Sequence, residues 1–277
     1  MMKEFKASRL KYQILKSNEC IESPFPLLRD STGEFTMRSI SPNHGRSYIV
    51  GQCKNGRYII TKGNGLAYSQ YEFINTREFG DDSMGLLLKK DAIRDFNLGN
   101  EIASLGIRTD HMQYVIELNK KLNLPTGHIL KPVLLQYDVE CPYRINDALF
   151  IENSTIQSYV KKWPDNHYKD KYLAASEVLI NNLRILHDNN ILHNAITTHN
   201  ITWALELLDF ELACSPIHPY DTEDEQRHVK DLFAREIIST YEIINVIASI
   251  LHESIDYQKV ERIFKKYDFN ISQYSIM

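Results

Sequence analysis

The residues best suited to chemistry lie in one short stretch of the second half of the chain. His193 is followed seven residues later by Asn200, and Asp209 follows after nine more, at the end of the apolar pair Leu207–Leu208. An asparagine carbonyl and an aspartate carboxylate are hard oxygen ligands of the kind that Mg²⁺ prefers. The pattern predicts a magnesium site at Asn200 and Asp209. The plainer alternative is a loop asparagine and an aspartate that caps a helix.

Two residues of the first half are candidates for the phosphates that such a metal would bridge. Lys62 ends the β-branched run Arg57–Lys62, and Asp95 lies in a stretch with helical character. In nucleotide sites a strand lysine that binds phosphates is held by an acidic residue on a nearby helix. We expect Lys62 and Asp95 to form such a pair, although each alone is more readily explained as a solvent-exposed side chain.

The elements of the first half follow from propensity and turn chemistry. Residues 47–62 predict a β-hairpin, because two β-branched and aromatic runs flank a turn at Lys54–Gly56. Residues 86–104 predict a helix that ends at Gly106. We further expect an irregular arm over 1–46, strands at 111–118 and 128–137, and a turn at Leu124–Gly127.

The second half is predicted to be mostly helical. Its clearest helix is Tyr172–His187, which has an apolar stripe at helical spacing and stops at Asp188–Asn190. We also expect helices at 223–251 and 257–267, and short strands at 191–193, 201–203 and 206–208. The predicted fold class is α+β, with an N-terminal arm (1–46), a small β-rich lobe (47–137) and a helical lobe (138–277).

This two-lobed layout is that of protein kinases and their relatives, and the motifs fit it. Kinase-like enzymes carry His-x-Asp-x-x-x-x-Asn and then an Asp-Phe-Gly-like triplet, in which the Asn and the second Asp hold the metal that bridges the ATP phosphates. His193 and Asn200 have this spacing, and Asp209-Phe210-Glu211 supplies the triplet with Glu in place of Gly.

Several segments, over about residues 47–235, resemble the selenoprotein O (YdiU) family of protein adenylyltransferases. The family motifs concerned are Lys-Gly-Ala-Gly-x-x-x-Tyr-Ser-Arg, Ile-Arg-Glu-Phe, Leu-Gly-Ile-Pro-Thr, and His-Gly-Val-Met-Asn-Thr-Asp-Asn-Met-Ser-Ile with the Asp that follows it. The corresponding segments here are Lys62–Gln70 (one residue shorter), Ile93–Phe96, Leu105–Thr109 and His193–Asp209, with a weaker continuation at Asp224–Arg227.

The resemblance implies a kinase-like fold that holds ATP in a reversed orientation and passes AMP to a hydroxyl of a protein side chain. It implies Lys62 on the phosphates with Asp95 as its partner, and Asn200 and Asp209 as ligands of Mg²⁺ or Mn²⁺. Arg144 is the candidate for one of the arginines that the family places on the terminal phosphates. The implied cofactors are ATP and the metal, and the implied partner is a protein acceptor.

Two departures bear on catalysis. The catalytic Asp of the family falls on His199, and the ordinary kinase base falls on Ala195, so neither position carries an acid. A neutral imidazole accepts a proton near pH 7, which makes His199 the candidate base. The same substitution fits a site that binds ATP without transfer. In addition, Asp95 is one methylene shorter than the Glu of the family, so pairing with Lys62 requires a closer helix.

Three functions remain open from the sequence. The first is adenylylation of a protein, with His199 as base. The second is a pseudokinase that binds nucleotide and acts through its partners. The third is a kinase-like phosphotransferase with ATP in the usual orientation, against which the missing acid at Ala195 counts.

Composition narrows the setting. The 277 residues are 43% hydrophobic and 25% charged, which is ordinary for a globular protein, and the net charge of −4 argues against a nucleic-acid binder. The four cysteines form no Cys-x-x-Cys pair, so we expect a reduced, cytoplasmic protein without a zinc site. No apolar run reaches the length of about 20 residues that a membrane helix needs, so no membrane partner is expected.

Overall fold

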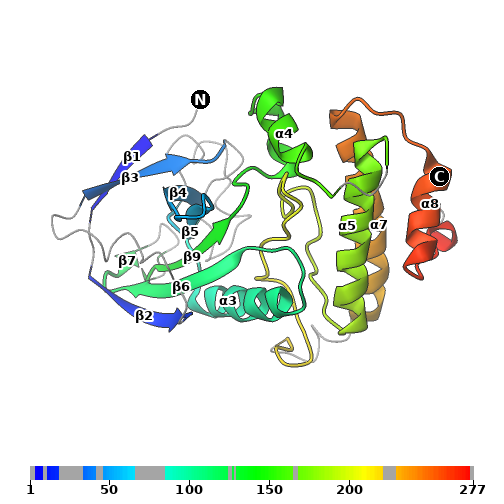
Figure 1. Ribbon diagram of the computed structural model, residues 1–277. Coiled ribbons are helices and arrows are strands. Elements are labelled where there is room, and N and C mark those ends of the chain that lie inside the picture. Colours follow the sequence, from blue (N-terminus) through cyan, green and yellow to red (C-terminus); the bar gives the residue numbers. More distant parts are fainter. Residues whose placement is uncertain are drawn as a thin grey trace. The chain divides into compact units, whose positions relative to one another are not determined.

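The computed structural model describes residues 4–8, 11–18, 34–41, 46–65, 85–123, 127, 129–164, 168–220 and 229–274. The chain divides into two compact units. The first comprises Met1–Asn100 and Asp110–Tyr143, and the second comprises Glu101–Thr109 and Arg144–Met277. Figure 1 shows the strands of the first unit in blue to green and the long helices of the second in green to red.

The first unit is built on a seven-stranded sheet with the order β1-β3-β4-β5-β9-β6-β2, and all of its strand pairs are antiparallel. Its strands are β1 (Glu4–Ser8), β2 (Tyr12–Ser17), β3 (Glu34–Ser39), β4 (Ser47–Gln52), β5 (Tyr58–Lys62), β6 (His111–Leu118) and β9 (Val133–Val139). A separate pair consists of β7 (Leu122–Asn123) and β8 (Ile129–Leu130).

The N-terminal residues differ from their sequence prediction. The segment expected to be an irregular arm contributes β1, β2 and β3, and β2 pairs with β6 in the register Tyr12↔Leu118. Of the other two strands, β1 pairs with β3 and β3 pairs with β4. Pairing with another strand stabilises each of these short segments, and propensity counted over a local window does not register it. The interpretation of residues 1–46 as irregular is therefore wrong for these strands.

The predicted hairpin is confirmed as β4 and β5, with Ser47 opposite Lys62. Its turn uses Gly56 at φ 86°, a conformation that glycine adopts without steric cost. The strand expected over 128–137 is divided, because Pro132 lacks the N–H that a continuous ladder requires. The central strand β9 begins only at Val133.

Helix α3 (Lys89–Ser104) confirms the helix predicted over 86–104. It buries an apolar side that includes Ala92, Phe96 and Ile102. The helix stops before Gly106, whose φ of 78° and hydrogen bond to the carbonyl of Ala103 end the helical backbone.

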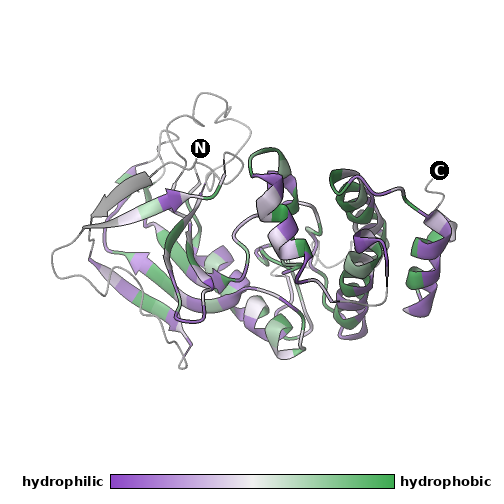
Figure 2. Cartoon of the chain, turned by 45° about the horizontal axis from the view of Figure 1, so that its top comes forward, coloured by the Kyte–Doolittle hydropathy of each residue, from purple (hydrophilic) through white to green (hydrophobic). Residues whose placement is uncertain are grey.

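The second unit is helical. It contains η1 (Ile145–Leu149), α4 (Asn153–Val160), α5 (Lys171–Asp188), α7 (Val229–Ile250), α8 (Tyr257–Lys266) and η2 (Ile271–Tyr274). Helix α5 packs against both α7 and α8 (Figure 1). Apolar and hydrophilic residues alternate along these helices in Figure 2, as expected for elements with one buried face. The three helices predicted for this half are present within the described residues.

The short strands expected at 191–193, 201–203 and 206–208 are wrong as strands. They form only isolated bridges: Leu192 with Cys214, Ile201 with Leu207, Thr202 with Arg144, and Leu207 with Thr109. Positive φ angles at Asn194 (63°) and Leu205 (59°) turn the backbone before a ladder extends. The overall α+β prediction, a β-rich part followed by a helical part, is confirmed. Among the helices described, none combines the length and the apolar character needed to span a bilayer.

Candidate functional site

The first unit brings Lys62 and Asp95 together. Lys62 Nζ lies 2.7 Å from Asp95 Oδ2, and the two side chains are 2% and 1% exposed. The alternative in which both side chains face solvent is therefore wrong, and the shorter Asp reaches the lysine. Burying two charges costs desolvation free energy that close pairing offsets only in part, so such a pair is weak evidence for stability. It is better evidence for a functional site.

The backbone next to Lys62 is fixed by Gly63. This glycine has φ 95°, and a Cβ added to it would lie 2.5 Å from the carbonyl oxygen of Val133 and 2.8 Å from Leu87 Cβ. Any larger residue would displace one of these neighbours. After Gly63, the Nδ2 of Asn64 donates a hydrogen bond back to the carbonyl of Thr61 at 2.7 Å. The lysine is thus held at the end of β5 by a turn that only glycine fits.

In the second unit, the His193 side chain binds the backbone of the loop that carries most of the predicted site residues. Its side chain is fully buried, and Nε2 lies 3.0 Å from the carbonyl oxygen of Leu208. The backbone N–H of Ala195 donates to Nδ1 at 3.2 Å. Burial lowers the pKa of His193, so the ring is neutral at neutral pH. These contacts tie the start of the loop to the residue that precedes Asp209.

A carboxylate of α7 holds the next residue of this loop. Glu236 Oε1 accepts the backbone N–H of Asn194 at 2.6 Å, and Glu236 Oε2 lies 2.9 Å from His187 Nε2. Asn194 has φ 63°, which asparagine tolerates better than most residues. Glu236 is only 3% exposed, and these contacts give each of its carboxylate oxygens a partner. It was missed from the sequence, because nothing local relates it to a partner 42 residues away.

The two predicted metal ligands lie on adjoining backbone. The N–H of Leu208 donates to the carbonyl of Asn200 at 2.9 Å, one residue before Asp209. Asn200 Nδ2 donates to the carbonyl of Ala195 at 2.9 Å, so Oδ1 is the atom with which this side chain would ligate a metal. The first of these hydrogen bonds therefore places the backbone of Asn200 next to Leu208, the residue before Asp209.

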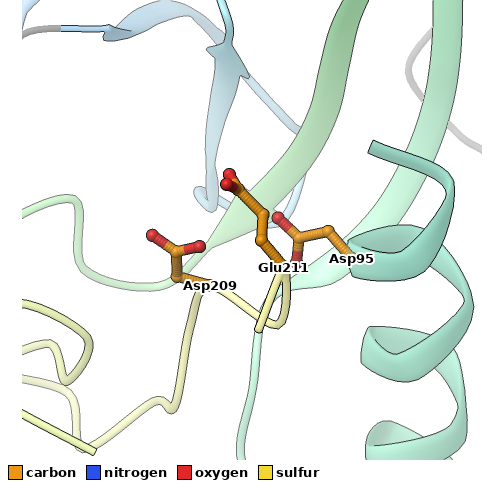
Figure 3. Close-up of side chains that lie close together, drawn as sticks. All are labelled: Asp95, Asp209 and Glu211. Atoms are coloured by element: carbon orange, nitrogen blue, oxygen red, sulfur yellow. The ribbon is translucent and has the colours of Figure 1, made fainter. Parts of the chain in front are cut away.

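Asp209 has a neighbour that the sequence analysis did not assign to the metal. Asp209 and Glu211 offer carboxylate oxygens within 4.8 Å of each other. Figure 3 shows both side chains extending from the same loop. Asp209 adopts φ 71°, a left-handed conformation that turns the chain between the two carboxylates. Glu211, which replaces the glycine of the kinase triplet, thus offers a carboxylate oxygen in addition to those of Asn200 and Asp209.

His199 and Arg144 lie on two segments of the second unit that pair with each other. Arg144 forms an antiparallel bridge with Thr202, and the N–H of Asn146 donates to the carbonyl of Thr198 at 3.3 Å. His199 is exposed, and its Nδ1 lies 2.8 Å from Asn146 Nδ2. Arg144 Nε is buried and has no hydrogen-bond partner in the part of the chain that the structure describes.

Two segments of the family resemblance cannot be placed. Residues 66–70 of the Lys62–Gln70 segment and all of Asp224–Arg227 lie outside the described residues, as does most of the turn at Leu124–Gly127. The segments Ile93–Phe96 and Leu105–Thr109 are described, and they occupy α3 and the stretch that follows it.

Comparisons with known proteins give little further information. No protein-family model matches the chain, and no curated protein matches it. Among solved structures, a Toxoplasma gondii specific rhoptry antigen kinase domain is similar with a TM-score of 0.37 and 11% identity. The match covers 67% of this chain and 52% of that one, so the chain spans about half the length of the solved structure.

Proposed function

We propose that the protein is a kinase-like, ATP- and Mg²⁺-binding transferase that passes AMP from ATP to a hydroxyl of a protein side chain. The observation that carries the proposal is the buried pair of Lys62 and Asp95, 2.7 Å apart, directly before the glycine turn at Gly63. A strand lysine held by a helix carboxylate is the arrangement that positions nucleotide phosphates in this class of enzyme.

The metal would be held in the second unit by Asn200 Oδ1, Asp209 and Glu211. All three offer hard oxygen atoms, which suit Mg²⁺ or Mn²⁺. When bound, the metal would bridge phosphate oxygens and neutralise charge that develops during transfer. Asp209 and Glu211 offer carboxylate oxygens within 4.8 Å of each other, which is close enough for both to ligate one cation.

Arg144 would bind the terminal phosphates. A guanidinium forms paired hydrogen bonds with phosphate oxygens, and its charge persists at all physiological pH values. The buried Nε of Arg144, which donates no hydrogen bond within the described residues, fits a group whose partner is a ligand. Arg144 bridges to Thr202, which lies two residues after Asn200 in the sequence.

The choice of AMP rather than phosphate rests on Ala195 and on the resemblance to the selenoprotein O family. A kinase places its catalytic acid at the position of Ala195, so phosphate transfer lacks its usual base. In AMP transfer the acceptor hydroxyl oxygen bonds to the α-phosphorus, and the bond from that phosphorus to the bridging oxygen breaks. Pyrophosphate leaves with the bond electrons, and the hydroxyl proton passes to solvent.

A protein acceptor is supported by exposed apolar side chains beside this segment. Leu149 is 91% exposed and Phe150 is 48% exposed, and both follow Asn146, the residue that contacts His199. Adjacent exposed apolar residues next to a site are suited to hold a partner protein. Serine at both positions is expected to weaken modification of a protein acceptor while leaving ATP binding unchanged.

The missing acids at Ala195 and His199 favour a second candidate, a pseudokinase that binds nucleotide and acts through partners. The two candidates share every nucleotide-binding residue. They differ in whether AMP is transferred, which makes the product mass the deciding observation.

The test is incubation of the purified protein with ATP and Mg²⁺ or Mn²⁺, followed by intact mass spectrometry. A gain of one AMP supports the proposal, and a gain of one phosphate contradicts the reversed orientation. No gain with a rise in melting temperature on adding Mg-ATP leaves the pseudokinase. Asp209→Asn is expected to abolish both effects. Asp188→Asn, which removes a carboxylate that is 52% exposed, is the matched control.

A further inference from the structure

We propose that Asn146 sets the tautomer of His199, so that His199 Nε2 carries a proton and acts as a hydrogen-bond donor to a phosphate oxygen rather than as a general base. The assignment of the tautomer stands on the geometry of the second unit alone. The role toward phosphate rests on the proposed function.

The contact between the two side chains determines the tautomer. Asn146 Nδ2 lies 2.8 Å from His199 Nδ1. An amide nitrogen only donates hydrogen bonds, so Nδ1 of the histidine must be the acceptor. A neutral imidazole has one protonated nitrogen, and with Nδ1 accepting, the proton lies on Nε2. A base needs an unprotonated nitrogen open to the substrate, and here the unprotonated nitrogen is the one that Asn146 covers.

Asn146 is held by backbone contacts to the same loop that carries His199. The N–H of Ile145 donates to the carbonyl of Ile201 at 2.9 Å, and the N–H of Asn146 donates to the carbonyl of Thr198 at 3.3 Å. These bonds lie on either side of His199 in sequence. The Asn146 side chain is therefore presented to His199 by a segment that is paired with the loop, which makes Asn146 a positioning residue.

The backbone at His199 is also held by a tight turn. The N–H of His199 donates to Thr197 Oγ1 at 3.2 Å, and the N–H of Asn200 donates to the carbonyl of Thr197 at 3.0 Å. This tight turn holds His199 directly before the proposed ligand Asn200. His199 is exposed, which leaves its side chain open to a ligand.

A donor at this position has a clear chemical use. Transfer of a phosphoryl or adenylyl group places charge on the non-bridging oxygens of the phosphorus, and a preorganised N–H stabilises that charge. The loss of one such donor costs about 10²–10³ in kcat in enzymes where it has been removed. The family has a catalytic Asp, which accepts a proton, at the position of His199. With His199 in its place, this position would supply a hydrogen-bond donor instead.

The direct test is long-range ¹H–¹⁵N NMR of the full-length protein labelled at histidine, without nucleotide. Spectra are recorded at a pH about two units above the ordinary imidazole pKa, with His199 assigned from His199→Gln. We expect Nε2 protonated and Nδ1 unprotonated. A parent spectrum with the proton on Nδ1 would overturn the proposal.

Variants of Asn146 sharpen the test. Asn146→Asp offers only oxygen atoms to Nδ1, so the proton of the ring is expected to move to Nδ1. Asn153→Asp adds the same charge at an exposed position of α4 and should leave the tautomer unchanged. If Asn146→Asp and Asn153→Asp give the same His199 spectrum as the parent, Asn146 does not set the tautomer.

The role toward phosphate is tested separately. Mg-ATP is expected to shift the Nε2 resonance of His199, and binding of Mg-ATP without such a shift overturns the donor role. For transfer, His199→Gln keeps an N–H donor and should retain activity within about 10-fold, whereas His199→Ala should lose about 100-fold or more. Equal loss in both variants contradicts the donor role. Failure of the parent to bind ATP would instead refute the proposed function, with the NMR result still deciding the tautomer.

Discussion

Two groups of residues, one in each unit, stand on different kinds of backbone. Lys62 and Asp95 stand on a regular strand and a regular helix, and both are almost fully buried. Asn194 and Asp209 stand on irregular backbone with φ angles of 63° and 71°, and the Asn194 N–H is held by Glu236. Regular elements thus fix a charged pair inside the core of the first unit, whereas the loop of the second unit relies on left-handed turns that regular elements do not provide.

The largest expected effect falls on the buried pair. Lys62→Met leaves the carboxylate of Asp95 buried without the lysine charge and should lower the free energy of unfolding by about 3–5 kcal/mol. Urea unfolding followed by circular dichroism measures the loss. Lys62→Met combined with Asp95→Leu should recover most of the stability while Mg-ATP binding stays absent. Lys89→Met, at a side chain that is 53% exposed, is the control. A double variant as unstable as Lys62→Met would contradict this account.

The next effect falls on the support of the irregular loop. Glu236→Ala removes the acceptor of the Asn194 N–H and of His187, and should lower the free energy of unfolding by about 2–3 kcal/mol. Glu236→Gln keeps one oxygen and should lose less. Hydrogen exchange of the Asn194 amide separates a local effect from a global one, since its exchange should accelerate more than that of β9. Unchanged exchange at Asn194 would show that α7 does not hold the loop.

A smaller effect is expected in the helical packing away from the site. Burial raises the pKa of Glu177, but hydrogen bonds from Lys266, Tyr168 and Tyr267 outweigh burial and lower it below its usual range. A lowered carboxyl pKa contributes stability that is present above the unfolded value of about 4.3 and is lost as the pH falls through the folded value.

Glu177→Gln should therefore cost about 1–2 kcal/mol at neutral pH, and the difference from the parent should shrink below about pH 4. Melting temperatures of both proteins between pH 3 and pH 7 measure it. A difference that stays constant over this range would show that the charge of Glu177 does not contribute.

The smallest effect on stability is expected at Asp209. Asn tolerates the left-handed backbone at this position, and the substitution removes one of two neighbouring carboxylates. We expect Asp209→Asn to change the free energy of unfolding by no more than about 1 kcal/mol, while the stabilisation by Mg-ATP disappears. A large loss of stability with Mg-ATP binding retained would show that Asp209 stabilises the fold and does not hold the metal.

Much of the regular structure was predictable. The hairpin at 47–62 has a turn at Gly56, and the helices α3 and α5 carry apolar stripes and clear stop signals. Lys62 and Asp95 were predicted to pair because a kinase-like site pairs a strand lysine with an acidic residue on a nearby helix, and each residue fell on such a predicted element. The strands of the first 46 residues were not predicted, because their stability comes from pairing with other strands, which for β2 means β6, about 100 residues away in the chain.

The sequence by itself determined which residues are available for chemistry, since Lys62, Asn200 and Asp209 occur at spacings set by local motifs. Only the tertiary structure decided their surroundings. It buried the Lys62–Asp95 pair, set Glu211 beside Asp209, and placed Asn146 against His199 from 53 residues away. The physical reason is that burial and hydrogen bonding depend on neighbours in space, whereas spacing and propensity describe only neighbours along the chain.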